Sequence, residues 1–343
     1  MSTDVMDPAL VKPLGKDDAR THASDVSVRQ VVTLLLPWVV LVILYVALVI
    51  RAPGYLTEVK SISFLVYSIT TLGVVAMGQL CVILIGGIDL SVSATLTLAN
   101  VVSAYILADK TNNHLFQAVV VCVLIGAVIG LGNGLAITKL GMPDMIATLA
   151  MMTLVTGAMF IFRTGHTNTG TAPALVSFSS VPFLGPIVPA ALMWLVLAAV
   201  LMVVLQKTTF GRQVFAVGLS RGAAHAAGIS VTRTTMILYV ISGVCAAMAG
   251  VLMTGQTGGM TLKSGDPYQL LSIAAVVLGG TSIFGGRGGY GSTIAGVAII
   301  IILKIGLLPA LGLSSASQNI IFGLVIIVML VIFRFGGKRD DAT

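Results

Sequence analysis

The chain carries little charge for its length. Asp, Glu, Lys and Arg make up 9% of its 343 residues, while hydrophobic residues make up 57% and the mean hydropathy is +1.06. Soluble domains carry about 25% charged residues, so this composition excludes an ordinary soluble domain and indicates an integral membrane protein. The net charge of +7 is a weak sign of nucleic-acid binding, because the basic residues are scattered between apolar runs.

Cysteine is also scarce. The chain has three cysteines, Cys81, Cys122 and Cys245, and each stands inside an apolar stretch. Their number is odd and no C-x-x-C pair occurs, so the sequence predicts neither a disulfide framework nor a zinc site. We expect all three to be small buried hydrophobic side chains.

Signatures of catalysis and nucleotide binding are missing as well. The chain has no H-E-x-x-H pair, and its four histidines lie in the N-terminal tail or in predicted loops. The glycine-rich run 284–291 lacks the Gly-Lys-Ser/Thr ending of a phosphate-binding loop. We therefore expect no enzyme active site, no metal and no cofactor bound by this chain. The better interpretation of the run is a cytosolic turn between spans, formed by Gly285, Gly286, Arg287 and Gly288.

What the chain has instead is a series of apolar runs of membrane-spanning length. An apolar helix of about 20 residues crosses the hydrocarbon core of a bilayer. The sequence thus predicts an all-α integral membrane protein with residues 31–335 as the transmembrane domain, between a flexible cytosolic tail at 1–30 and a short one at 336–343. The predicted spans are 31–50, 62–82, 88–108, 117–138, 144–162, 187–206, 235–255, 269–284, 290–308 and 318–334.

The basic residues predict the orientation of these spans. With ten spans and both termini inside, 13 of the 19 Lys and Arg residues face the cytosol. This bias is the usual one for inner loops. The six exceptions are Arg51, Lys60, Lys110, Arg163, Lys263 and Lys304.

The segment Gly86–Ser91, with the sequence GGIDLS, has two open interpretations. It is either a tight cytosolic turn or a break within the membrane, where irregular backbone must be buried in protein or face water. A second double glycine, Gly279-Gly280, also follows a Val-rich run, which makes internal duplication possible. In a chain with 38 glycines the match can also be chance.

A few polar residues lie within the apolar runs. Charge is costly there, so Asp89 either serves a translocation path or, like Ser91, caps the helix that follows. Amides offer donors and acceptors to sugar-like hydroxyls but equally hold helices together. We take as candidates for the path Gln79, Asp89, Ser91, Asn100 and Asn133.

Small residues stand at two further places. Gly126, Gly130 and Gly134 recur at a spacing of four, which predicts close helix packing within the subunit or between two copies. The segment from Lys207 to Arg233 carries four basic residues and no acid. It is expected to face the cytosol and to offer a docking surface.

Four segments carry a resemblance to a known family. They are Gly86–Val92, Gly211–Gly218, Ala224–Ile229 and Ala274–Gly288, in this order. Together they resemble the permease subunits of ribose/xylose-type bacterial ABC sugar importers, from about residue 31 to 335.

The resemblance implies a multi-pass inner-membrane subunit that pairs with a second copy, or with a closely related permease. A cytosolic ATPase with two nucleotide-binding halves would bind ATP and Mg, and a periplasmic binding protein would deliver a pentose or related sugar. The resemblance also implies a coupling helix that rests on the ATPase, formed here by Ser220, Arg221, Gly222, Ala223, Ala224, His225, Ala227, Gly228 and Ile229.

The chain departs from the family at this helix. Relatives commonly carry an acid at its start, and here Arg221 stands nearby instead. Either the partner surface has changed to match, or the contact is mainly shape and apolar packing. The rival interpretation of the whole chain is a self-sufficient secondary transporter or channel; an intramembrane enzyme is disfavoured because no nucleophile–base or metal constellation is present.

Overall fold

The fold is described from a computed structural model, for residues 35–159, 170–314, 316–324 and 327–328. No β-strand occurs among these residues. The predicted tails at 1–30 and 336–343 lie outside them. The helices are Leu35–Arg51, η2 (Pro53–Leu56), α2 (Val59–Leu84), α3 (Val92–Ile106), α4 (Leu115–Thr138), α5 (Asp144–Met159), α6 (Pro173–Ser180), α7 (Pro189–Lys207), α8 (Thr209–Leu219), α9 (Arg221–Ala226), α10 (Val231–Thr257), α11 (Asp266–Leu278), α12 (Tyr290–Ile301), η3 (Ile302–Leu307), α13 (Leu308–Ala310) and 316–324.

Five helices are long and apolar enough to cross a membrane by length and composition: α2, α4, α7, α10 and the continuous stretch Tyr290–Ala310. Four shorter apolar helices accompany them, Leu35–Arg51, α3, α5 and α11. Each of these nine falls on a predicted span, and the tenth span is described only in part, at 316–324. The expected all-α membrane architecture is confirmed.

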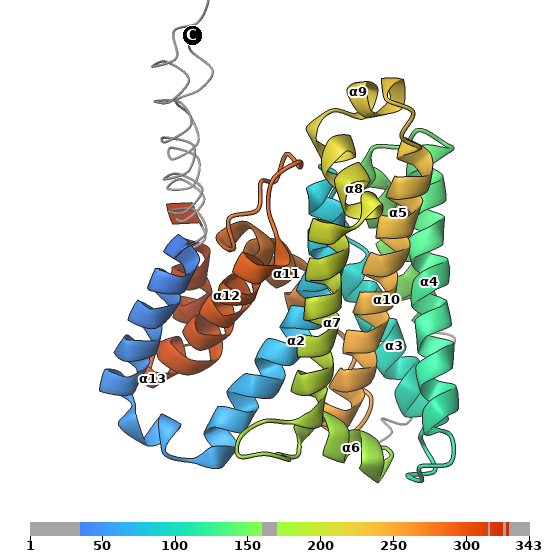
Figure 1. Cartoon of the computed structure of the whole chain (residues 1–343). Helices are drawn as coiled ribbons and strands as arrows, with labels where there is room; N and C mark the ends of the chain where they lie inside the picture. Colours follow the sequence, from blue (N-terminus) through green and yellow to red (C-terminus); the bar gives the residue numbers. More distant parts are fainter. Residues whose placement is uncertain (1–34, 160–169, 315, 325–326, 329–343) are drawn as a thin grey trace, which may run out of the picture.

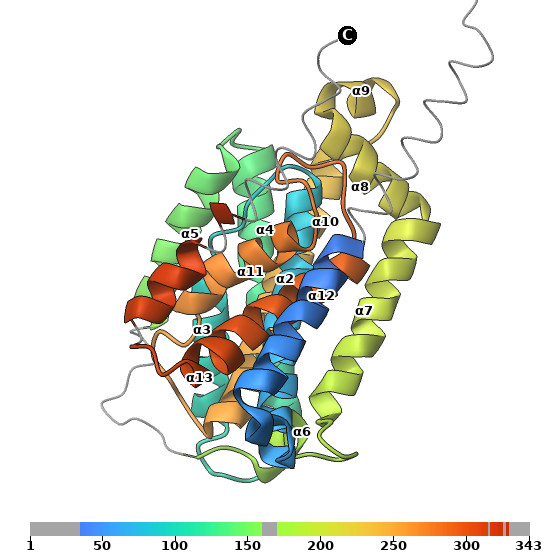
Figure 2. The ribbon, with the colours of Figure 1, turned by 90° about the vertical axis from the view of Figure 1, so that its left-hand side faces the viewer.

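The helices form one bundle with two distinct ends (Figure 1). α9 projects at one end, called here the α9 end, and α6 closes the other, the α6 end. α10 packs against α2, α3 and α4. On the face turned to the viewer in Figure 2, the first helix lies near α12 and α13. A Cβ on Gly306 of η3 would stand 2.9 Å from the Leu48 side chain of that first helix, so the two pack closely.

The glycine stripe of α4 is the contact with α10. A Cβ on Gly126 would lie 2.3 Å from the Gly243 carbonyl oxygen, and one on Gly130 would lie 2.2 Å from the Tyr239 carbonyl oxygen. Gly134 meets the Met236 backbone in the same way. Small residues at such spacing let helix backbones approach where the solvent is apolar. Of the two interpretations left open by the sequence, the structure shows the contact within the subunit.

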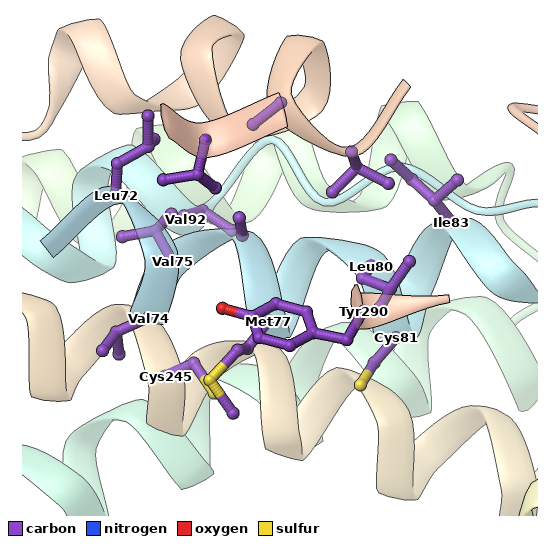
Figure 3. Close-up of a cluster of buried hydrophobic side chains, with 14 of the residues drawn as sticks. Leu72, Val74, Val75, Met77, Leu80, Cys81, Ile83, Val92, Cys245 and Tyr290 are labelled. Carbon is purple, nitrogen blue, oxygen red and sulfur yellow. The ribbon is translucent and has the colours of Figure 1, made fainter. Parts of the chain in front are cut away.

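The core is mainly apolar, and one of the polar links between its helices is made by Tyr290. Figure 3 shows Tyr290 of α12 lying among side chains of α2, near Met77 and Cys81. Its hydroxyl accepts from Trp194 Nε1 at 2.6 Å and donates to the Gly73 carbonyl oxygen at 2.8 Å. This relay joins α7, α12 and α2 and satisfies both aromatic polar groups, as burial requires. Cys81, Cys122 and Cys245 are buried and unpaired, as expected.

One helix ends earlier, and another begins later, than the hydrophobic pattern predicts. The span predicted at 269–284 stops at Leu278, and the one at 88–108 begins only at Val92. The physical reason is glycine. Gly280 adopts φ +82° and donates to the Val277 carbonyl oxygen, while Thr281 donates to that of Val276, which is the Schellman arrangement that terminates a helix.

The first double glycine ends α2 in the same way. Gly86 has φ +76° and donates to Ile83, and Gly87 donates to Val82. The two segments thus share one cap geometry as well as a sequence pattern. Duplication of a larger unit stays a prediction, because a helix-ending glycine is common by itself.

The α4–α10 contact yields a stability prediction. Gly126→Ala places a methyl group against the Gly243 carbonyl oxygen, so the helices must separate, and we expect a loss of about 2–3 kcal/mol of unfolding free energy. Gly157→Ala is the matched control, because nothing lies within 4 Å of its Cβ position on α5. That change should be neutral or stabilising by about 0.5–1 kcal/mol. Thermal melting in detergent measures both, and equal melting temperatures would contradict the contact.

Candidate functional site

The basic segment folds into two short helices at the α9 end. Thr208 caps α8 by accepting a hydrogen bond from Gly211 N–H, and Ser220 caps α9 by accepting one from Ala223 N–H. α8 was not anticipated from the sequence. Its signal was present, because Thr208 precedes apolar residues at Phe210, Val214 and Val217, which is helical spacing.

α9 is short and exposed. It spans six residues, and Gly228 ends it with φ +79° in a third Schellman cap. Of the residues predicted to form the coupling helix, Ala224 alone is buried; Ile229 is half-buried, and the exposed ones are Ser220, Arg221, Gly222, Ala223, His225, Ala227 and Gly228. The structure therefore holds out a short projection made mostly of alanine and glycine, with Arg221 and His225 as its larger exposed side chains.

The run Gly218–Gly222 spells G-x-S-x-G, the letters of a nucleophile elbow, in a chain whose sequence predicts no enzyme active site. Its structural context is different. An elbow joins a strand to a helix and presents the serine as a nucleophile. Here the run joins α8 to α9, and the Ser220 side chain accepts the Ala223 N–H as a helix cap. The letters thus coincide with a capped helix junction.

The α9 end is anchored where three backbone segments meet without side chains between them. A Cβ on Gly218 of α8 would stand 2.0 Å from the Leu84 carbonyl oxygen and 2.5 Å from Gly286 N. Gly286 N–H donates to that same Leu84 oxygen at 2.9 Å. The predicted glycine turn is formed, with Gly285 and Gly286 both at positive φ, and it seals the end of α2. We call the contact of Leu84, Gly218 and Gly286 the glycine junction.

The segment after α2 carries a buried polar network. Asp89 is 1% exposed. Its Oδ1 accepts from the N–H and the hydroxyl of Ser91 at 2.9 and 2.6 Å, and its Oδ2 accepts from the Ser242 hydroxyl of α10 at 2.7 Å. Asn133 of α4 donates to the Ser91 hydroxyl at 2.8 Å. The capping interpretation is wrong in its detail, because no side chain accepts an N–H of the first turn of α3 and Asp89 binds the N-cap residue Ser91 itself. Through Ser91, Ser242 and Asn133, Asp89 instead joins the start of α3 to α10 and α4.

The depth of this network bears on the open question about GGIDLS. Ser242 lies 11 residues into α10, or about 17 Å from the start of that helix at 1.5 Å per residue. Asp89 is thus held beside the interior of a long helix. Of the residues of the segment 86–91, Gly86 alone is exposed, and the rest are buried or half-buried. That setting matches the condition under which irregular backbone is tolerated at membrane depth.

Asn100 belongs to a second network, away from Asp89. Its Nδ2 donates to Thr254 Oγ1 at 2.8 Å and to the Gly259 carbonyl oxygen at 3.1 Å, and its Oδ1 accepts from Thr261 N–H at 2.8 Å. Its amide group is therefore occupied on both sides. Asn100 holds α3 to the end of α10 and the loop that follows, which is the structural role that buried amides often have.

Gln79 stands apart from both networks. It lies on α2 and is fully buried, yet neither its Oε1 nor its Nε2 has a hydrogen-bond partner among the described residues. Asn133 Oδ1 on α4 also has no hydrogen-bond partner among the described residues. The five residues predicted for a path thus divide: Asp89, Ser91 and Asn133 come together, Asn100 belongs to the second network, and Gln79 is hydrogen-bonded to neither.

Arg221 has a partner that the sequence did not identify. Its Nη2 lies 3.4 Å from Oδ2 of Asp144, the first residue of α5. The Asp144 side chain is 16% exposed and that of Arg221 is 47% exposed. The base of α9 is therefore linked to the transmembrane body by an ion pair.

Comparison with known proteins gives consistent matches. The model of a family described as "Branched-chain amino acid transport system / permease component" matches residues 61–330. The chain is 38% identical to the ribose import permease protein RbsC of Bacillus subtilis, covering 87% of this chain and 92% of that one. It is 31% identical to the fructose import permease protein FrcC of Rhizobium meliloti, covering 86% and 84%. It is 32% identical to the L-arabinose transport system permease protein AraH of Escherichia coli, covering 88% and 90%. No solved structure matches.

The Asp89 network predicts unequal effects of two substitutions. Asp89→Ala leaves the Ser91 and Ser242 donors buried without an acceptor, so we expect a loss of about 2–4 kcal/mol of unfolding free energy. Asp89→Asn keeps an acceptor for Ser91, and the Ser242 hydroxyl can turn to accept, so its melting temperature should fall less. The control is Asp109→Ala. Asp109 accepts the same pair of bonds from Thr111 but is exposed, so water replaces it and melting should barely change. Equal melting of the Asp89→Ala variant and wild type would rule out the network as a structural support.

The unpartnered amide of Gln79 predicts that its removal does not destabilise the protein, in contrast to the removal of Asp89. Gln79→Met removes two buried polar atoms at nearly constant volume, so stability should stay equal or rise by about 1–2 kcal/mol. Asn100→Leu removes satisfied bonds and strands Thr261 N–H, so it should lose about 2–3 kcal/mol. Melting in detergent compares the two. A drop for Gln79→Met as large as for Asn100→Leu would show that Gln79 has partners of its own.

Proposed function

This chain belongs to the permease-component family that it matches, and on that premise we propose that it is the membrane-spanning subunit of an ATP-driven importer of monosaccharides in the bacterial inner membrane. The observation that carries the proposal is the run of relatives named for ribose, fructose and arabinose import, each covering over 80% of both chains. The cargo is then a neutral, hydroxyl-rich sugar.

The energy comes from a partner in this proposal. The chain has no Gly-Lys-Ser/Thr phosphate loop, so ATP and Mg would bind to a separate cytosolic ATPase with two nucleotide-binding halves. A periplasmic sugar-binding protein would supply selectivity at the other face. Two copies of the permease would form the path between them. The α9 end would face the cytosol, in line with the basic residues Lys207, Arg212 and Arg233 gathered there.

Docking would use α9. This helix projects from the bundle, is exposed on all but one residue, and has Arg221 and His225 as its only large side chains. Such a shape suits insertion into a groove on the ATPase. The ATPase would close on binding ATP, and α9 would pass that motion to the bundle. For this to drive transport, the permease must favour different states with and without nucleotide on its partner.

Reconstitution tests the function. The permease is placed in proteoliposomes with its cognate ATPase, with ATP at the ATPase side and sugar-loaded binding protein at the other. We expect uptake of radiolabelled sugar that requires all three components and stops when ATP is replaced by a non-hydrolysable analogue. The matched control is a permease with residues 220–228 replaced by a Gly-Ser linker, which should keep the fold but lose ATPase co-purification.

The rival function makes the opposite prediction. A secondary transporter or channel takes up sugar with an ion gradient, or with none, in vesicles that lack the ATPase. Uptake under that condition would overturn the proposal.

A further inference from the structure

The Arg221–Asp144 ion pair stands at a junction between the exposed helix α9 and the buried segment 86–91. Asp144 Oδ2, which faces Arg221, also lies 2.8 Å from the position that a Cβ on Gly87 would occupy. The hydroxyl of Tyr239 on α10 lies 2.8 Å from that same point. Two polar atoms therefore flank Gly87. The Asp144 carboxylate fits there because glycine has no Cβ. The pair is in contact with the GGIDLS segment as well as with α9.

α5 touches the segment a second time, one turn further on. The Thr148 hydroxyl lies 3.2 Å from the Ile88 carbonyl oxygen and 2.9 Å from that of Asp144. Residues at i and i+4 share one face of a helix, so the same face of α5 meets Gly87 and Ile88. A displacement of the first turn of α5 is thus transmitted to backbone rather than to flexible side chains.

The next residue in the chain fastens the segment to the bundle. Asp89 accepts from Ser242 of α10, and through Ser91 it reaches Asn133 of α4. The order of contacts is therefore α9, Arg221, Asp144, residues 87–88, Asp89, and then α10 and α4. Each step is a packed or hydrogen-bonded contact, which is the kind of contiguous route that coupling between sites can follow.

We propose that Arg221 and Asp144 form a transmission latch that ties the docking helix α9 to the GGIDLS segment. In this inference, which rests on the proposed importer function, Arg221 is a positioning residue and faces the bundle rather than the partner. The absence of an acid on α9 then has a cause within the subunit: the first turn of α9 is used for an inward contact, and docking depends on the shape of the remaining exposed residues.

The test uses the complete importer in proteoliposomes and measures sugar taken up per ATP hydrolysed. Arg221→Gln and Asp144→Asn should each lower this ratio by about tenfold, as expected for loss of a contact on a coupling route. ATP hydrolysis and co-purification with the ATPase should persist. Arg221→Lys should keep part of the ratio, because an ammonium still pairs with the carboxylate. The matched control is Arg212→Gln, an exposed arginine on α8 with no ion-pair partner in the described part of the chain.

A double variant decides whether the two residues act together. If they form one latch, the double variant Arg221→Gln/Asp144→Asn should take up as much sugar per ATP as the more impaired of the two single variants. Independent roles would instead give losses that multiply. Multiplying losses, or a wild-type ratio in both single variants, would overturn the latch. Melting temperatures close to wild type separate loss of coupling from loss of fold. A wild-type complex that shows no ATP-dependent uptake would instead count against the proposed function.

Discussion

Backbone groups cannot be left unpaired where helices end inside an apolar body, and this chain ends two helices there, α2 at Leu84 and α11 at Leu278. Glycines at positive φ close both ends through Schellman bonds. Gly286 N–H supplies a further donor to the Leu84 carbonyl oxygen. Asp89 then accepts the Ser91 N–H at the start of α3. The glycine junction and the Asp89 network both supply hydrogen-bond partners to backbone groups between helices, and the glycine junction lies at the α9 end.

Close backbone approach is the second theme of the structure. An apolar solvent gives little drive to bring apolar helices together, so packing depends on how near the backbones come. The α4–α10 contact is made by glycines on both helices, and Gly218 brings α8 onto the end of α2. The bundle therefore has tight, discrete contacts at the places where a docking helix would need a stiff connection.

The site combines an exposed projection with an inward connection. α9 holds out small residues, while Arg221 at its base is linked to Asp144, and Asp144 stands against Gly87. Of the polar residues within the bundle, Asp89, Ser91 and Asn133 share this region and Asn100 is engaged elsewhere. The polar groups of the GGIDLS region thus connect helices, whereas both polar atoms of the fully buried Gln79 have no hydrogen-bond partner among the described residues.

The sequence by itself determined the membrane class, the position of the apolar helices and the place of the basic segment between two of them, because hydropathy and charge are local properties. It also marked Gly126, Gly130 and Gly134 as a contact face. It did not reveal the partner of that face, the early end of α11 or the α8 helix within the basic segment. Only the tertiary structure brought Arg221 to Asp144, 77 positions apart, and Gly218 and Gly286 to the end of α2 at the glycine junction. Ion pairs and backbone contacts of this kind depend on which helices become neighbours, and neighbours are set by the packing of the whole bundle.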